Sequence, residues 1–150
     1  MNRAVEMISK DSHVRSHEVA ILGVTAEEGY LRLLAPDNFR GVGQTPLSSA
    51  NSLAAHTVRE KRPELINRFS VAPHASVFEA VPIADDVRSD PIQKIMSVPL
   101  ILGSTVISVV QVSRKGKLLA ETGPDFTYPQ LRELKAISDP LAPCIILCKE

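Results

Sequence analysis

Three polar side chains near the middle of the sequence have the residue types of a hydrolase triad. Ser52, His56 and Glu60 lie four residues apart, so a helix would place them in one line. A catalytic serine needs a histidine base that a buried acid orients. The G-x-S-x-G motif that positions many such serines does not occur. An exposed polar helix face is therefore the favoured interpretation, and we expect no enzyme activity; a weaker alternative is a small enzyme that uses His74 or Ser76.

Two pairs of metal-ligating residue types also have helical spacing. His13 and His17 form one pair, and Cys144 and Cys148 form the other; either pair could supply half of a tetrahedral site. The histidines lie where the first helix should already be ending. The cysteines fall on an apolar stripe, where a free cysteine behaves as a small hydrophobic side chain. Packing is therefore favoured over a metal for both pairs, and a joint site would require the two termini to be adjacent.

The motifs that bind phosphate and nucleic acid are absent from the sequence. Neither G-x-G-x-x-G nor G-x-x-x-x-G-K-[ST] occurs. Seventeen basic residues balance seventeen acidic ones, whereas a nucleic-acid surface needs a basic excess. A local group of cations is favoured as a solvated helix end rather than a binding patch, so we expect no nucleic-acid partner. Its members are Arg59, Lys61, Arg62 and Arg68.

A pocket for a small molecule is the kind of site that the sequence favours most. Such a pocket combines apolar walls with a few convergent polar groups. Segment 68–91 has no sustained periodicity, and long loops in compact domains are often binding lids, with disorder as the alternative. The expected ligand-binding residues are Phe69, His74, Ser76 and Phe78 in this segment, and Ser97, Ser108 and Gln111 in the apolar stretch after it.

Gln111 is the most informative of these residues because it stands among Val109, Val110 and Val112. A buried amide must find hydrogen-bond partners or its burial is unfavourable. The alternatives to ligand contact are a bond to the backbone or a place at a wet sheet edge. For His74, the alternative is a solvated side chain in a loop.

Two apolar hairpins would hold these residues. Residues 19–24 and 30–35 alternate around a polar turn. Residues 93–102 and 104–114 flank Gly103-Ser104, with glycine at the first position of a type II′ turn. The second hairpin is apolar on both faces, with Ile107 expected on the side of Val109, so it should lie mid-sheet with both sides covered. Pro99 cannot donate to a ladder and is expected at an edge or a bulge.

Helical patterns surround these strands. They cover residues 1–14, the stretch after Ser52, and residues 128–148, where Thr127 and Gln130 form a capping box. Pro143 predicts a kink in the last helix, and residues 64–67 predict a short strand. This order indicates an α+β fold, an antiparallel sheet with helices packed against it.

Size and composition are consistent with one soluble domain. The chain has 150 residues, so we expect residues 1–150 to form a single domain. No apolar run reaches the roughly 18 residues of a membrane span, and the first residues lack the apolar core of a secretion signal. We therefore expect a cytoplasmic protein with reduced cysteines and no membrane partner.

Two stretches resemble the end of a GAF domain, namely MSVPLILGSTVISVVQVSRKG at 96–116 and DFTYPQLRELKAIS at 125–138. SLAAHTVREKRPELINRF at 52–69 is similar to the middle helix and following strand of that family. The resemblance covers residues 18–140. It departs at Ser108, where the family often has glycine, and at Pro140 and Pro143, where the last helix usually continues.

This resemblance implies an antiparallel sheet of five or six strands, with terminal helices on one face. A ligand pocket, formed by loops and a short helix, would lie on the other face. Members of the family bind cyclic nucleotides, haem, bilins or 2-oxoglutarate, and many form pairs through their terminal helices. The cyclic-nucleotide signature N-K-x(n)-F-x(3)-D-E is not evident, and the pocket-region cysteines of the bilin and free methionine sulfoxide reductase branches are absent. The ligand or cofactor therefore stays unidentified.

The resemblance and the residues together favour a non-catalytic sensor or regulatory module. Its small-molecule pocket would be roofed by segment 68–91, and it would signal through a partner protein or as a homodimer joined by the terminal helices. The alternative is a ligand-free dimerisation or interaction scaffold of the same fold.

Overall fold

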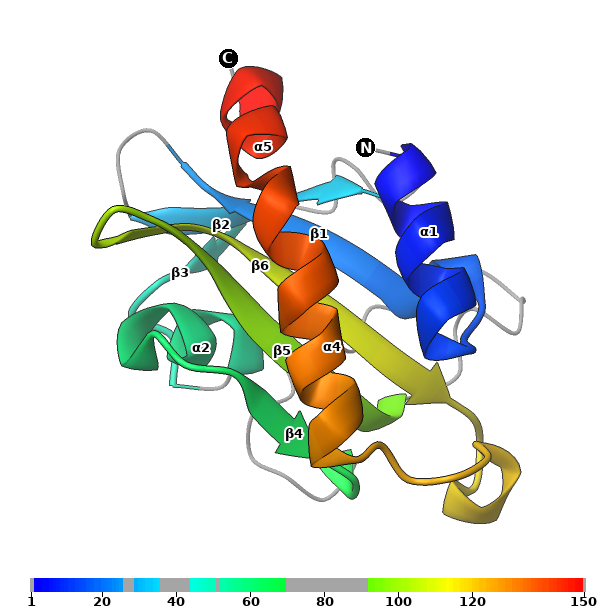
Figure 1. Ribbon diagram of the computed structural model, residues 1–150. Coiled ribbons are helices and arrows are strands. Elements are labelled where there is room, and N and C mark those ends of the chain that lie inside the picture. Colours follow the sequence, from blue (N-terminus) through cyan, green and yellow to red (C-terminus); the bar gives the residue numbers. More distant parts are fainter. Residues whose placement is uncertain (1, 26–28, 36–43, 51, 70–91, 150) are drawn as a thin grey trace.

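A six-stranded antiparallel sheet forms the centre of the molecule, with strand order β3-β2-β1-β6-β5-β4 (Figure 1). The computed structural model describes residues 2–25, 29–35, 44–50, 52–69 and 92–149. The strands are β1 (Val19–Val24), β2 (Tyr30–Ala35), β3 (Gln44–Pro46), β4 (Glu64–Ile66), β5 (Ile92–Leu102) and β6 (Thr105–Lys115). Both expected hairpins and the short strand are therefore confirmed.

The hairpin of β5 and β6 lies in the middle of the sheet, as expected. β6 pairs with β1 on its other side, and β5 pairs with β4. The turn has Gly103 at a φ of 67° while Ser104 keeps a negative φ, which is the φ pattern of a type II′ turn. β4 pairs only with residues 95–97. Pro99 therefore lies beyond the end of β4, where its missing N–H removes no bond to that strand.

A β-bulge in this hairpin changes which side chains share a face. Ile101 pairs with Val106, but Leu100 pairs with Ser108, so Ile107 is the extra residue. Ile107 packs in the same apolar cluster as Val110, whereas Val109 packs in the cluster on the other side. The expectation that Ile107 shares a face with Val109 was therefore wrong, because the extra residue shifts the alternation by one.

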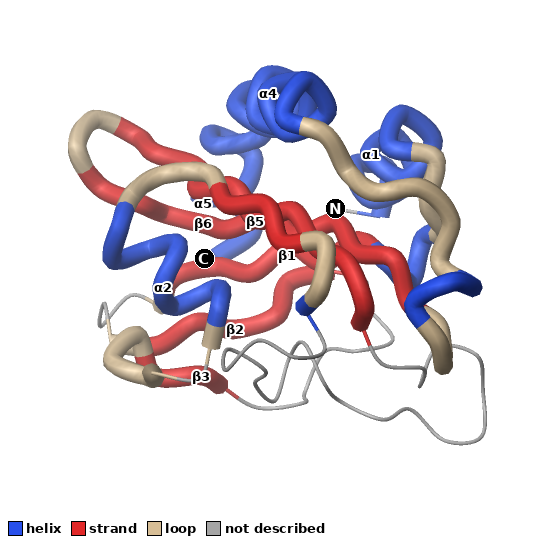
Figure 2. Tube along the Cα trace, turned by 90° about the horizontal axis from the view of Figure 1, so that it is seen from below, coloured by secondary structure: helices blue, strands red, loops and turns tan. Residues whose placement is uncertain are grey.

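The helices lie in two layers, one on each side of the sheet (Figures 1 and 2). One face is covered by α1 (Asn2–Ser12), α4 (Tyr128–Ser138) and α5 (Ala142–Lys149), and α2 (Leu53–Glu60) lies on the other. Single turns of 3-10 helix occur at η1 (Ser16–Glu18), η5 (Leu119–Glu121) and η6 (Asp139–Leu141). This is the α+β arrangement expected from the sequence, with the terminal helices on one face.

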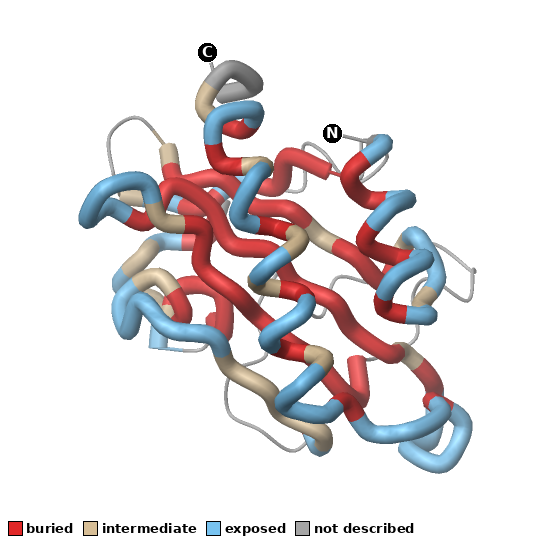
Figure 3. Tube along the Cα trace, viewed as in Figure 1, coloured by how far each residue is buried: buried red, intermediate tan, exposed pale blue. Residues whose placement is uncertain are grey.

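Both faces of the sheet carry apolar clusters, and the main core lies under the terminal helices. Ile8 of α1, Leu134 of α4 and Ile145 of α5 pack there against β5 and β6. Figure 3 shows buried residues along the strands and at intervals along α1 and α4, where each helix turns one side toward the sheet. A one-sided apolar stripe of this kind fixes which face of a helix is buried.

Side-chain caps set where the helices begin. The Ser52 hydroxyl accepts a hydrogen bond from the Ala55 backbone N–H at 3.1 Å and starts α2. Thr127 and Gln130 form the expected capping box of α4. The expected kink is a 3-10 turn between α4 and α5, at Pro140 and just before Pro143.

One side chain fixes the approach to α4. The Asn67 amide donates to the Phe126 carbonyl at 3.0 Å and accepts from the Phe126 backbone N–H at 2.9 Å. This pair of bonds joins the end of β4 to the residue before the α4 cap. The connection from β6 to α4 is thereby tied to the edge strand of the sheet.

Candidate functional site

Three of the predicted ligand-binding residues lie on the α2 face of the sheet. Ser97 and Gln111 are directly opposite each other in β5 and β6, and Phe69 packs with Leu53 and Ile95 beside them. Ser108 lies apart from this group. It pairs with Leu100, which packs under the terminal helices, and its hydroxyl donates to the Leu22 carbonyl. His74, Ser76 and Phe78 lie outside the described residues.

A row of polar groups crosses the α2 face. Glu64 of β4 is opposite Ser97, and Ser97 is opposite Gln111. The Gln111 amide Nε2 donates to the Ser97 hydroxyl at 3.3 Å, and that hydroxyl is 2.8 Å from the hydroxyl of Thr57 on α2. Ser97 and Thr57 are fully buried, and Gln111 is 4% exposed. These three side chains form one buried hydrogen-bonded chain between the sheet and the helix. We call the four residues Thr57, Ser97, Gln111 and Glu64 the polar row.

The polar row reaches the protein surface at a contact between α2 and β4. The Nδ1 atom of His56 is 2.7 Å from the Glu64 carboxylate oxygen Oε1. The Thr57 hydroxyl is 3.2 Å from that same oxygen and 2.9 Å from the Leu53 carbonyl. A hydroxyl has one proton to donate, so Thr57 satisfies one of these acceptors at a time. The Ser97 hydroxyl is a third possible acceptor, so the polar row has more than one hydrogen-bond arrangement with the same heavy-atom positions.

Apolar side chains flank the polar row on both sides. Val109, Leu22 and Ala55 form one cluster, and Leu53, Phe69 and Ile95 form the other. A few convergent polar groups between apolar walls are the usual composition of a small-molecule site. Buried polar groups in such surroundings are stable only when they are hydrogen-bonded. In this structure the members of the polar row satisfy one another.

Sequence reasoning identified Gln111 and Ser97 but missed their partners. Thr57 and Glu64 had no motif, and their roles follow from the packing of α2 on β4 and β5. Ser52, His56 and Glu60, which have the residue types of a hydrolase triad, each have a different role in the structure. Ser52 caps α2, His56 contacts Glu64, and Glu60 lies 3.7 Å from Arg62 at the surface.

A separate hollow of about 210 Å³ lies between the C-terminal end of α2 and the β5–β6 turn. It contains none of the predicted ligand-binding residues. Its lining is mostly apolar, with Lys61 donating to the Ser104 carbonyl. The residues that line it are Val24, Leu47, Val58, Lys61, Ser104, Thr105 and Val106.

The metal-ligating residue types are dispersed. Within the described residues, no group of three or more His, Cys, Asp or Glu side chains is arranged to hold a metal ion. His13 is exposed in a left-handed conformation after α1. Cys144 is exposed on α5, while its neighbour Ile145 occupies the buried stripe. The apolar environment expected for Cys144 was therefore wrong, and the side chain of Cys148 lies outside the described part of the chain.

None of the described helices has the length and apolar character that a membrane span requires.

Sequence comparisons identify no relative, whereas the fold has many. No family model and no curated protein matches the chain. The GAF-B domain of DevS from Mycobacterium smegmatis superposes with a TM-score of 0.66 at 12% identity, covering 97% of this chain and 90% of that one. The GAF domain/HD domain protein from Geobacter sulfurreducens gives 0.65 at 11% identity, covering 99% and 93%.

One similar structure is that of an enzyme. The type II free methionine-R-sulfoxide reductase from Thermoplasma acidophilum superposes with a TM-score of 0.65 at 14% identity, covering 97% of this chain and 89% of that one. Identities this low establish a shared fold, and one fold supports several activities.

Proposed function

We propose that this chain, which has the fold of a GAF domain, is a sensor or regulatory module that binds a small molecule on the α2 face of its sheet. The observation that carries the proposal is the buried row of Thr57, Ser97 and Gln111 within an otherwise apolar surface. An apolar core would not need these side chains, because replacing a satisfied polar pair with apolar groups of the same shape is often neutral. A ligand with a polar edge and an apolar body would hydrogen-bond to these polar side chains and pack against the apolar ones around them.

Segment 68–91 is proposed as the roof of this pocket. The described residues on either side of positions 70–91, Phe69 and Ile92, belong to the same apolar cluster beside the polar row. Because these two residues lie in one cluster, the segment between them begins and ends next to the proposed pocket. Phe69 is 2% exposed and would form part of the pocket wall.

Ligand binding would change the position of α2. The contacts of His56 and Thr57 with Glu64 hold this helix against β4. A ligand that takes over the hydrogen bonds of Gln111 and Ser97 would release or tighten that contact. The size of the shift in α2 would depend on how much more tightly the ligand binds one position of α2 than the other.

The output would pass to the terminal helices on the opposite face. Side chains along β5 and β6 alternate between the two faces, so Ser97 and Gln111 have Val98 and Val110 as neighbours under the helices. A shift of these strands would move the packing of α1, α4 and α5. We propose that a partner protein or a second copy of the chain reads this movement through those helices.

The second candidate function is a ligand-free interaction scaffold. It is favoured by the fact that the members of the polar row hydrogen-bond one another. A face whose polar groups are satisfied internally is stable without a ligand. The two functions therefore differ in whether the α2 face holds a small molecule in the purified protein.

Removal of small molecules from the purified protein separates the two functions. One sample is kept as purified, and the other is unfolded in denaturant, dialysed and refolded. For a sensor, native mass spectrometry should show extra mass on the first sample and none on the second. Amides of α2 and β4 should exchange hydrogen about tenfold more slowly in the first sample, as a ligand present at about ten times its Kd would cause.

Circular dichroism of the two samples provides the control, and the spectra should coincide if refolding is complete. A dimer of bare polypeptide mass, with equal exchange of α2 in both samples, would support the scaffold and reject the sensor.

A further inference from the structure

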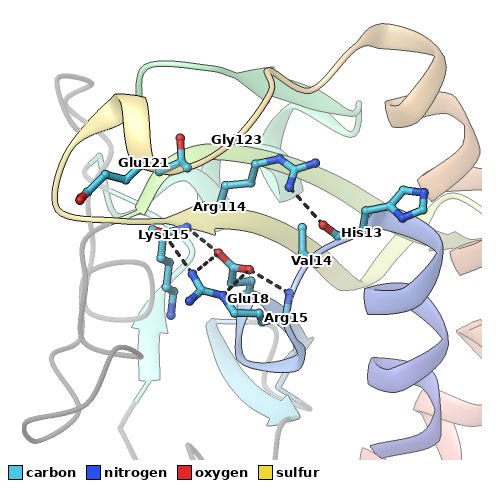
Figure 4. Close-up of a pocket in the computed structure, with 9 residues that line it drawn as sticks. His13, Val14, Arg15, Glu18, Arg114, Lys115, Glu121 and Gly123 are labelled. Atoms are coloured by element: carbon cyan, nitrogen blue, oxygen red, sulfur yellow. Dashed lines mark hydrogen bonds and ion pairs between the residues drawn. The ribbon is translucent and has the colours of Figure 1, made fainter.

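A second cleft lies at the far end of β6, away from the polar row (Figure 4). It has a volume of about 450 Å³ and is bounded by the connection from α1 to β1, the end of β6 and the turn after η5. Three cationic side chains and two carboxylates line it. The lining residues are His13, Val14, Arg15, Glu18, Arg114, Lys115, Glu121, Thr122 and Gly123.

Arg15 in this cleft shows how a guanidinium binds a carboxylate side-on. Its Nε and Nη2 atoms donate to the two Glu18 carboxylate oxygens, each at 3.1 Å. The same oxygens accept the backbone N–H groups of Arg15 at 2.9 Å and Lys115 at 2.6 Å. Figure 4 shows these bonds converging on Glu18. The Glu18 carboxylate therefore has its main acceptor positions filled.

Arg114 has the same side-on edge, and none of the described carboxylates accepts a hydrogen bond from its Nε atom. It is 9% exposed, its Nη1 atom donates to the His13 carbonyl at 3.1 Å, and its Cζ atom lies 4.7 Å from the centre of the Phe126 ring. Its Nε atom has no hydrogen-bond partner in the part of the chain that the structure describes. The adjacent buried cation Lys94 differs, because its Nζ atom lies 2.9 Å from the Asp125 carboxylate.

Burial of this guanidinium is unfavourable without a fully bonded partner. Burial lowers the pKa of Arg114, and the charge of Glu18 acts in the opposite direction. A buried donor left without a partner retains its desolvation cost, and buried charges are normally paired. Because Glu18 is already bonded to Arg15 and Lys115, it cannot also fill the Nε–Nη2 edge of Arg114.

We propose that this cleft binds a small anion through a carboxylate or phosphate group held side-on by Nε and Nη2 of Arg114. Both groups match the planar fork of a guanidinium. The Nε atom is covered in this conformation, so binding would require the guanidinium to rotate about its terminal bonds, at the expense of the Nη1 bond to the His13 carbonyl. The bound anion would connect the end of α1 to the segment that leads into α4. This site is separate from the proposed pocket under α2 and does not depend on it.

The test is a titration of the protein labelled with ¹⁵N, with the arginine Nε–H signals as the readout. Inorganic phosphate and succinate are added separately, each at constant ionic strength maintained with sodium chloride. The Nε–H signal of Arg114 should shift and saturate with one or both anions. A response to phosphate alone or to succinate alone supports the proposal and identifies the anion class.

Variants distinguish the fork from simple charge attraction. Arg114→Lys keeps the charge but loses the fork, so the affinity measured from nearby backbone amides should fall at least about tenfold. Arg132 is exposed on α4, and Arg132→Lys should leave the affinity unchanged. Glu121→Gln removes an exposed carboxylate beside the cleft and should raise the affinity about twofold.

The proposal is overturned if neither anion gives a saturable shift of the Arg114 signal in the wild-type protein. It is also overturned if folded Arg114→Lys binds as tightly as the wild type. The wild-type titration and the Glu121→Gln variant keep the test valid if Arg114→Lys does not fold.

Discussion

Replacing Glu18 with alanine should lower the free energy of unfolding by about 2–4 kcal/mol. The Glu18 side chain is 5% exposed and accepts four hydrogen bonds, three from Arg15 and one from the backbone N–H of Lys115. The last of these joins the residue before β1 to the last residue of β6. Its loss leaves the Lys115 backbone N–H without this acceptor and removes a negative charge that acts on buried Arg114. The half-exposed Arg15 regains water, which keeps the cost below that of a fully buried pair. Urea unfolding at pH 7 measures the difference.

Glu121→Ala is the matched control for this substitution. Glu121 lines the same cleft but is exposed, and its carboxylate accepts a backbone N–H from Leu118 within the turn. The free energy of unfolding should change by less than about 1 kcal/mol. Equal losses of unfolding free energy from the two substitutions would show that the burial and hydrogen bonding of Glu18 do not stabilise the fold beyond the contribution of an exposed carboxylate.

The stabilisation by Glu18 should also depend on pH. Burial raises the pKa of this carboxyl, but the side-chain and backbone hydrogen bonds from Arg15, the backbone N–H of Lys115 and the Arg15 charge together lower it below the ordinary value of 4.5. Because the folded-state pKa is below the unfolded-state pKa, the stabilisation is complete above about pH 4.5 and is lost as the pH falls through the folded-state pKa. The stability difference between wild type and Glu18→Gln should therefore shrink between pH 5 and pH 3. A difference that is constant over this range would contradict the proposed role of the charge.

Leu134→Ala should lower the free energy of unfolding by about 2–5 kcal/mol, the range for deleting a buried leucine side chain. Leu134 is 1% exposed and packs from α4 into the cluster that also contains residues of α1, α5, β5 and β6. Its removal leaves a cavity where the sheet joins its helix layer. Thermal or urea unfolding followed by circular dichroism measures the loss.

Arg132→Ala provides the comparison on the same helix. Arg132 is exposed, so its removal should change the stability by about 0.5 kcal/mol or less. A loss for Leu134→Ala no greater than this would mean that α4 does not pack on the sheet as described.

Local signals in the sequence were sufficient to predict most of the fold. The Gly103-Ser104 turn, the Thr127–Gln130 capping box and the kink near Pro143 involve residues close in the chain, and the structure contains all three. Each depends on backbone geometry or capping bonds that a few neighbouring residues determine. The placement of the long hairpin mid-sheet followed from its apolar character on both faces.

The candidate site was harder to predict because it depends on strand register. A regular two-residue hairpin would place Ser97 opposite Val110, but the bulge at Ile107 places it opposite Gln111. Nothing in the apolar run of residues 105–112 marks the bulged position. The polar row therefore exists because of one extra residue that side-chain periodicity does not reveal.

Ser108 could have been separated from Gln111 by sequence reasoning. The two residues are three positions apart in one strand, and an odd separation places side chains on opposite faces. Contacts between distant segments could not be predicted in this way. Thr57 meets Ser97, and Glu18 meets Lys115, only through tertiary packing.

Native mass spectrometry of freshly purified wild type, Gln111→Leu and Ser108→Ala is the most direct test of the small-molecule site under α2. Gln111 faces that site, whereas Ser108 lies in the same strand on the other face. The account predicts extra small-molecule mass on the wild type and on Ser108→Ala, with the bound fraction reduced at least about tenfold in Gln111→Leu. Bare polypeptide mass in all three proteins, or equal bound fractions in all three, would contradict it.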